Sequence, residues 1–149
     1  MLATQSIPGN GWGKSSAEEQ ARRSIYIHVK RSLHVPLVEA LDMAETDKSC
    51  PVRFVTVQPT QALTMLNSTF MGEEAQKLAD RLRREAGEDV TKQVELGLCL
   101  VLNRTPSKRE IDRGVKFVGD LKSAGASNEL AMKYFGLMAY NLNEFVYLD

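Results

Sequence analysis

Basic residues gather early in the chain, at spacings that bring several of them together if the segment is helical. Arg23 and Lys30 are seven residues apart, which is close to two helical turns. Each has a basic neighbour, Arg22 and Arg31 respectively. Guanidinium and ammonium groups bind phosphate, sulfate and carboxylate, so these four residues are a candidate anion-binding site. The alternative is that they hold elements together by pairing with acids of the chain, such as Asp42, Asp47 or Glu144.

Two histidines and two cysteines are the other residues that could serve catalysis or bind a metal. No serine or cysteine motif of a hydrolase accompanies His28 or His34. Cys50 and Cys99 lie too far apart for a zinc or haem motif. The apolar stretch around Cys99 predicts a buried free thiol, and a disulfide with Cys50 is the alternative in an oxidising compartment. We expect no catalytic residue, no metal, no cofactor and no turnover from this chain alone.

Several amide side chains and one tryptophan have both a ligand-binding and a structural interpretation. Amides near helix ends commonly bond backbone groups that the helix leaves open. The amides in such positions are Gln61, Asn67, Asn141 and Asn143. Trp12 stands among glycines, where its ring could stack on a sugar or bury itself at the edge of the domain. We favour the structural interpretation for all five residues.

The elements that position these residues are helices, because capping signals precede apolar stripes of helical period in most segments. Ser107 and Glu110 have capping-box spacing, and Asp89 precedes an apolar helical segment. Gly87 is typical of a helix end. Residues 45–58 are predicted to form an ordered loop. The predicted helices cover about 15–33, 36–44, 59–67, 69–86, 90–102 and 106–121, with a last one beginning at 127.

These signals predict a mainly α protein, with a single domain of about six or seven helices and one long ordered loop over residues 1–149. Residues 1–14 are expected to be an irregular lead-in, and no sheet larger than a two-stranded ribbon is expected. Because the chain opens within a glycine-rich loop, we expect it to be a piece of a longer protein. Apolar positions at helical spacing include Leu78, Leu82, Val94, Leu98, Val118, Leu130, Tyr134 and Leu137.

Composition narrows the classes of function. The 149 residues include 19 Lys and Arg against 19 Asp and Glu, whereas a protein that holds nucleic acid is usually visibly basic. No run approaches the roughly 18 apolar residues that a transmembrane helix needs. We therefore expect neither nucleic-acid binding nor a membrane span.

Three short elements, taken together, resemble one known family. They are Arg22-Arg23-Ser24, Pro59-Thr60-Gln61-Ala62-Leu63 and Asn143-Glu144-Phe145. The chain resembles the C-terminal domain of large planctomycete-type secreted proteins, the domain of unknown function numbered fifteen fifty-three. The resemblance implies that the chain is the C-terminal portion of a larger multidomain protein with an extracytoplasmic location, periplasmic or secreted. The upstream regions of such proteins often carry a haem segment or a lectin-like sandwich. It supplies no established catalytic residues.

Two functions remain open at this point. The first is a non-catalytic helical interaction or scaffold module, whose partners are upstream domains of the same polypeptide or another protein. The alternative is a contribution to a composite site that binds or processes polysaccharide, with the four basic residues of the candidate anion-binding site contacting an anionic glycan. The apolar end Phe145-Val146-Tyr147-Leu148 favours the first, because uncovered apolar surface marks a contact site or drives self-association.

Overall fold

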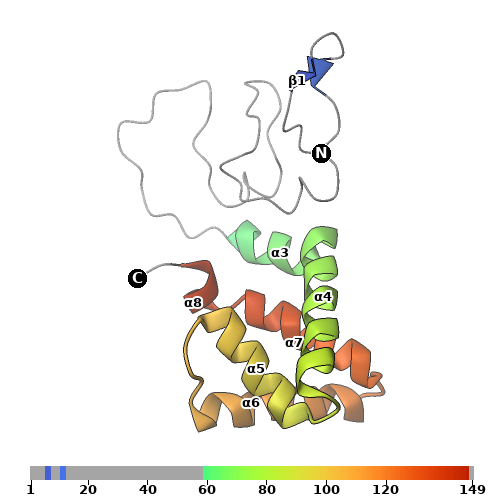
Figure 1. Cartoon of the computed structure of the whole chain (residues 1–149), viewed down its shortest axis with the longest axis vertical. Coiled ribbons are helices and arrows are strands. Elements are labelled where there is room, and N and C mark those ends of the chain that lie inside the picture. Colours follow the sequence, from blue (N-terminus) through green and yellow to red (C-terminus); the bar gives the residue numbers. More distant parts are fainter. Residues whose placement is uncertain (1–5, 8–10, 13–58, 148–149) are drawn as a thin grey trace. The chain divides into compact units, whose positions relative to one another are not determined.

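The computed structural model describes residues 6–7, 11–12 and 59–147 of the chain (Figure 1). Packing divides the chain into two compact units, Met1–Thr64 and Met65–Asp149, so one domain over the whole length stays a prediction. The first two predicted helices and the predicted loop over 45–58 lie outside the described residues. The same holds for Arg22, Arg23, Lys30, Arg31, His28, His34 and Cys50.

A short antiparallel ribbon forms near the start of the chain. Strand β1 (Ser6–Ile7) pairs with strand β2 (Gly11–Trp12), and Ser6 stands opposite Trp12. The lead-in that the sequence predicted to be irregular therefore contains a ribbon of two strands. The sequence predicted no sheet larger than a two-stranded ribbon, and this ribbon does not exceed that size.

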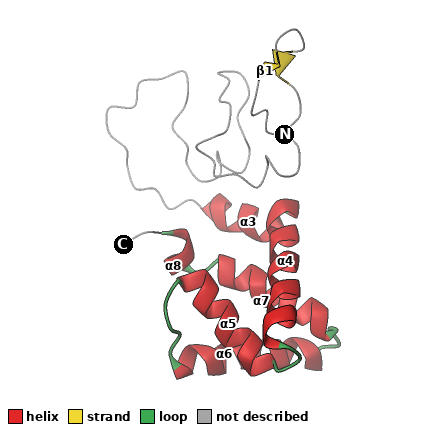
Figure 2. Ribbon diagram, viewed as in Figure 1, coloured by secondary structure: helices red, strands yellow, loops and turns green. Residues whose placement is uncertain are grey.

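Six helices account for most of residues 59–147 and confirm the prediction of a mainly α fold (Figure 2). The predicted segments from residue 59 onward match these helices closely. The last predicted helix divides into two, because Asn141 and Leu142 interrupt it. The helices are α3 (Pro59–Asn67), α4 (Thr69–Ala86), α5 (Val90–Leu102), α6 (Lys108–Ser123), α7 (Asn128–Tyr140) and α8 (Asn143–Val146).

Local hydrogen bonds explain where the helices begin and end. The Asp89 carboxylate accepts bonds from the first backbone N–H groups of α5, as its position predicted. Ser107 and Glu110 form the predicted capping box at the start of α6. Gly87 ends α4 at a φ of 67°, a conformation that favours glycine. Ser68 precedes α4, but its side chain makes no capping bond.

Four helices of the second unit surround one core. α7 packs along α4, α6 packs against α7, and α5 contacts all three of the others. Each helix contributes a large, fully buried apolar side chain: Leu82 from α4, Val94 from α5, Val118 from α6 and Phe135 from α7. The apolar stripes that the sequence predicted for α4, α5 and α6 therefore do form the core.

Two glycines allow α5 and α6 to approach the Phe135 ring closely. A Cβ atom added at Gly97 would lie 2.8 Å from Phe135 Cε1. One added at Gly114 would lie 2.6 Å from Val94 Cγ1 and 3.2 Å from Phe135 Cε2. The ring therefore fills space that glycine leaves on two neighbouring helices.

Two apolar positions of α7 are exposed, and one prediction about burial, that of Cys99, is wrong. Leu130 and Tyr134 are 40% and 44% exposed, because α7 turns Phe135 and a set of mostly small residues towards the core instead. Cys99 is a free, exposed cysteine rather than a buried thiol. It follows the buried Leu98, and a helix turns by about 100° per residue, so Cys99 faces away from the core.

Candidate functional site

The corner between α5 and α6 places one arginine where three helices meet. α5 ends at Leu102, and Asn103 then adopts the left-handed conformation with a φ of 52°. Asparagine tolerates this conformation better than most residues, so the chain can turn sharply here. Arg104 follows at the outside of the turn, and the buried Pro106 leads the chain into α6.

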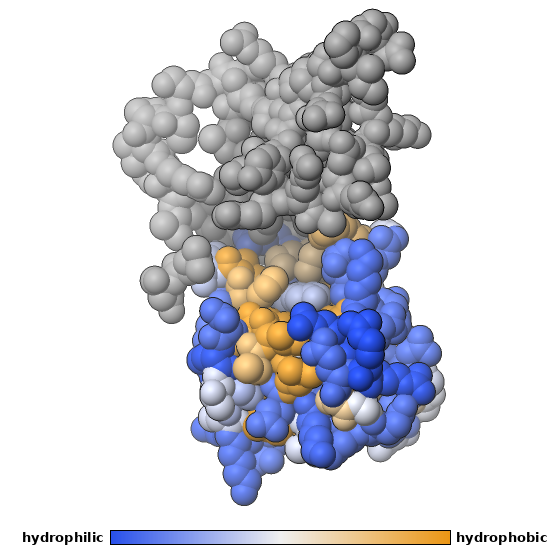
Figure 3. Space-filling model, viewed as in Figure 1, coloured by the Kyte–Doolittle hydropathy of each residue, from blue (hydrophilic) through white to orange (hydrophobic). Residues whose placement is uncertain are grey.

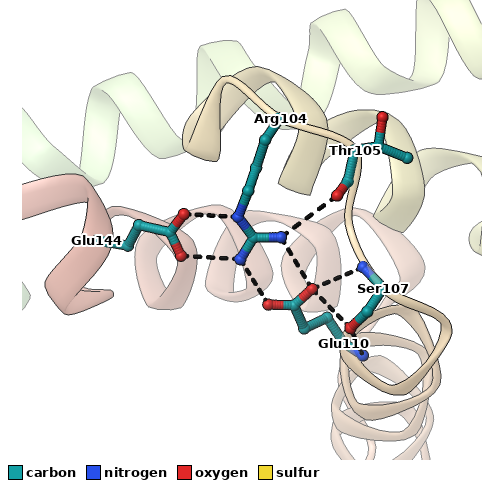
Figure 4. Close-up of polar contacts among 5 residues, drawn as sticks. All are labelled: Arg104, Thr105, Ser107, Glu110 and Glu144. Carbon is teal, nitrogen blue, oxygen red and sulfur yellow. Dashed lines mark hydrogen bonds and ion pairs between the residues drawn. The ribbon is translucent and has the colours of Figure 1, made fainter.

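Arg104 binds two carboxylates at once (Figure 4). Its Nε and Nη2 atoms donate to the two oxygens of Glu144 in α8, at 2.6 and 2.8 Å. Its Nη2 and Nη1 atoms also donate to Glu110 in α6, at 2.7 and 3.1 Å. A further bond runs from Nη1 to the Thr105 carbonyl oxygen at 3.3 Å. Such forked pairs are the strongest form of this interaction. We call Arg104, Glu110 and Glu144 the Arg104 clasp.

The Arg104 clasp shifts the titration of its members. The bond from Arg104 is the largest cause that holds the pKa of Glu110 down at about 2, and bonds from the backbone and hydroxyl of Ser107 add to it. The same guanidinium lowers the pKa of Glu144. Both carboxylates in turn raise the pKa of Arg104. All three groups face solvent, so salt screens these interactions.

Replacing Arg104 by Gln should make the stability of the protein less dependent on pH in acid. The folded chain binds fewer protons than the unfolded chain between the ordinary glutamate value of 4.5 and the folded Glu110 value of about 2. The clasp therefore stabilises the fold above about pH 4.5 and loses this effect as pH falls towards 2. In urea unfolding, the wild type should have a larger free energy of unfolding than the variant near neutral pH. This difference should shrink as the pH falls through this window.

Arg109→Gln is the matched control, because Arg109 is an exposed arginine of α6 without an ion pair among the described residues. Its effect on the free energy of unfolding should not change across the same window. A gap between wild type and the Arg104 variant that stays constant from neutral to acid pH would contradict the clasp.

An apolar groove begins beside the Arg104 clasp. One hollow of about 690 Å³ has Glu110 and Glu144 at its edge, and a second of about 470 Å³ adjoins it. The two hollows share Phe117, Met138, Asn141 and Leu142. We call them together the apolar groove. Its remaining lining residues are Leu66, Leu98, Leu102, Arg113, Gly114, Leu121, Tyr134, Leu137 and Asn143.

Much of the apolar surface of this unit is accessible. Leu66 and Tyr134 line the groove and are 46% and 44% exposed. On the face of the molecule that Figure 3 shows, apolar surface gathers over α5, and hydrophilic surface lies beside it over α4. Leu100 of α5 and Phe145 of α8 are also exposed, although the Phe145 ring contacts Tyr140 at a centroid distance of 5.1 Å. Exposed apolar surface of this kind is typical of contact sites.

The structure describes some of the site residues that the sequence proposed, but not the four basic ones. Asn141 Nδ2 donates to the Leu137 carbonyl oxygen at 2.8 Å, which confirms its structural interpretation. Glu144, suggested as a partner for the early basic residues, pairs with Arg104. Sequence reasoning missed Arg104, although the capping box beside it marked the place where Glu110 would be held. The four residues of the candidate anion-binding site lie outside the described residues.

Neither a metal centre nor a membrane-spanning helix emerges from the described ranges. Among residues 6–7, 11–12 and 59–147, no three side chains of His, Cys, Asp or Glu are placed to hold a metal ion. No helix in the same ranges is long and apolar enough to cross a membrane.

The helices of the second unit thus define a small α-helical bundle with an apolar groove and a charged clasp at its edge. The family model PSD1, described as a protein of unknown function (DUF1553), matches residues 3–118, and the chain belongs to this family. No curated protein and no solved structure matches the chain.

The family match ends inside the helical bundle rather than at its edge. Residue 118 lies in α6, whereas α7 supplies Phe135 to the same core and α8 supplies Glu144 to the Arg104 clasp. The Asn143-Glu144-Phe145 element that contributed to the resemblance therefore lies beyond the matched residues. The compact unit extends past them to include α7 and α8.

Proposed function

We propose that this chain is a non-catalytic helical interaction module of a larger secreted protein. In this proposal the apolar groove binds an apolar segment of an upstream domain or of another protein. The secreted location rests on the family resemblance alone. The single observation that carries the interaction role is the apolar groove itself.

The size and lining of the groove support a peptide segment as its occupant. Its two hollows, of about 690 and 470 Å³, are within the range in which proteins bind ligands. Apolar side chains such as Phe117 and Met138 form its walls, and an amphipathic helix buries its apolar face in grooves of this kind. Glu110, Arg113 and Glu144 stand along one part of the lining, where they would fix the direction of a bound segment.

The alternative function, an anion-binding surface in a composite polysaccharide site, stays a hypothesis from the sequence. Its residues are Arg22, Arg23, Lys30 and Arg31, which lie outside the described part of the chain. In the described part, Arg104 is held by two carboxylates of the chain itself. That arginine therefore lends the alternative no support.

A binding experiment tests the groove directly. A fluorescently labelled, leucine-rich amphipathic helical peptide should bind the chain saturably, whereas a scrambled peptide of the same composition should not. Tyr134→Glu places a charge in the apolar lining and should weaken binding about tenfold, equivalent to about 1.4 kcal/mol. Fluorescence anisotropy measures both affinities.

Thr91→Glu is the matched control, because it adds the same charge at an exposed position of α5 that does not line the groove. It should leave the affinity unchanged. Self-association of the wild type that Tyr134→Glu abolishes in light scattering would also support the groove as a contact surface. A strict monomer that binds neither peptide would reject the proposal.

A further inference from the structure

A separate, polar hollow lies beside α4 and the start of α7. Its volume is about 280 Å³, and it shares no lining residue with the apolar groove. Residues of α4, of the turn after it, of α5 and of α7 line it. They are Ala79, Asp80, Arg83, Glu88, Gln93, Asn128, Glu129 and Met132. We call it the α4–α7 hollow.

Two buried amide oxygens of the α4–α7 hollow have no hydrogen-bond donor among the described residues. Gln93 is only 1% exposed, and its Nε2 donates to the Gly87 carbonyl, which fixes which end of the amide is the oxygen. Within the part of the chain that the structure describes, no group donates a hydrogen bond to its Oε1 or to the buried Oδ1 of Asn128. Buried acceptors in folded proteins almost always have a donor. Ordered water or a ligand that donates hydrogen bonds would satisfy these two oxygens.

The α4–α7 hollow also carries uncompensated negative charge. Gln76 Nε2 donates to Asp80 Oδ1 at 3.1 Å and to Glu129 Oε1 at 3.2 Å, so a neutral amide holds the two carboxylates near each other. No lysine or arginine of the described residues pairs with either one. Arg83 is engaged by Glu88 at 2.8 Å. Three carboxylates and one guanidinium line the hollow, so its formal charge is −2.

These features together define the chemistry of a ligand. It must carry positive charge and donate hydrogen bonds, and Ala79 and Met132 offer an apolar wall to an alkyl stem. A primary ammonium has three donors on a compact charge, which suits carboxylates and amide oxygens together. A metal ion suits the lining less, because Arg83 is part of it and the described residues contain no metal-binding cluster of carboxylates.

We propose that the α4–α7 hollow binds a primary alkylammonium group, either on a lysine side chain or on a small free amine. Asp80 and Glu129 would supply the charge, and the unpartnered oxygens of Gln93 and Asn128 would accept hydrogen bonds. The inference does not depend on the proposed role of the apolar groove, since the two sites have no residue in common.

Nuclear magnetic resonance of the full chain tests this inference. Titration with n-butylammonium should shift the side-chain amide signals of Gln93 and Asn128 saturably. The uncharged isostere n-butanol should not shift them. Asp80→Asn and Glu129→Gln keep the shape of each side chain and should each weaken binding about three- to tenfold. Glu95→Gln is the control, because Glu95 is an exposed acid of α5 that does not line the hollow; it should leave binding unchanged.

Further ligands distinguish a lysine side chain from a free amine as the source of the ammonium group. They also define the results that would overturn the inference. Tighter binding of an acetylated lysine amide than of n-butylammonium would assign the hollow to a lysine side chain. The reverse order would assign it to a free amine. Saturable binding of calcium in place of the amines would overturn the inference in favour of a metal site. Absence of a saturable shift, or equal weakening by the Glu95 control, would overturn it outright.

Discussion

Phe135→Ala should lower the free energy of unfolding by about 3–5 kcal/mol, the range for removing a buried aromatic ring. Phe135 is fully buried, and its ring lies against the glycine faces of α5 and α6. Glycine offers no side chain that could move into the space left behind, so the cavity would collapse poorly. Urea unfolding followed by circular dichroism measures the loss.

The neighbouring residue provides the control for this variant. Tyr134 is 44% exposed on the same helix, so Tyr134→Ala should change the free energy of unfolding by about 1 kcal/mol or less. Similar losses from the two variants would mean that α7 does not present Phe135 to the core. They would then contradict the packing around this ring.

Gly114→Ala should destabilise the protein by about 1–3 kcal/mol, although alanine is the better helix former. The added methyl would lie 2.6 Å from Val94 Cγ1 and 3.2 Å from Phe135 Cε2, so α6 would have to move away from the core. Gly119 of the same helix has nothing within 4 Å of an added Cβ. Gly119→Ala should therefore stabilise the protein by about 0.5–1 kcal/mol. Thermal and urea unfolding compare the two variants.

A second substitution identifies the cause of the Gly114 effect. Val94→Ala removes the atom that the new methyl would meet, so the double variant should lose less stability than the two single losses predict together. Simple additivity would show that the loss at Gly114 has another origin. A gain in stability from Gly114→Ala would refute the close contact itself.

The start and end signals of the helices could be read from the sequence because they depend on nearby residues. Asp89, Ser107 and Glu110 act within one helical turn, and α5 and α6 begin where these residues predict. The face that a helix buries depends instead on its neighbours. In α7 the buried Gly136 lies against Ala75 and Leu78 of α4, where it allows close approach, whereas Tyr134 is exposed. Apolar spacing alone therefore does not show which face of that helix is buried.

The candidate sites were hidden from the sequence for a related reason. Arg104 and Glu144 are separated by 40 residues, and no local pattern relates an arginine in a turn to a glutamate in the last helix. The α4–α7 hollow combines α4, α5 and α7 in the same way. The charge balance of the whole chain gave no sign of its local excess of carboxylates.

The small size of α8 gives the Arg104 clasp a consequence for motion. The four residues of α8 cannot form a stable helix in water by themselves. The conformational entropy lost on nucleating a turn exceeds the stabilisation from the hydrogen bonds of that turn. The turn thus persists only through its attachments, chiefly the Arg104–Glu144 pair and the contact between Phe145 and Tyr140. Opening of the pair would release α8 while the four-helix core stays folded, so the end of the chain can exchange its amide hydrogens by local fraying far faster than the core.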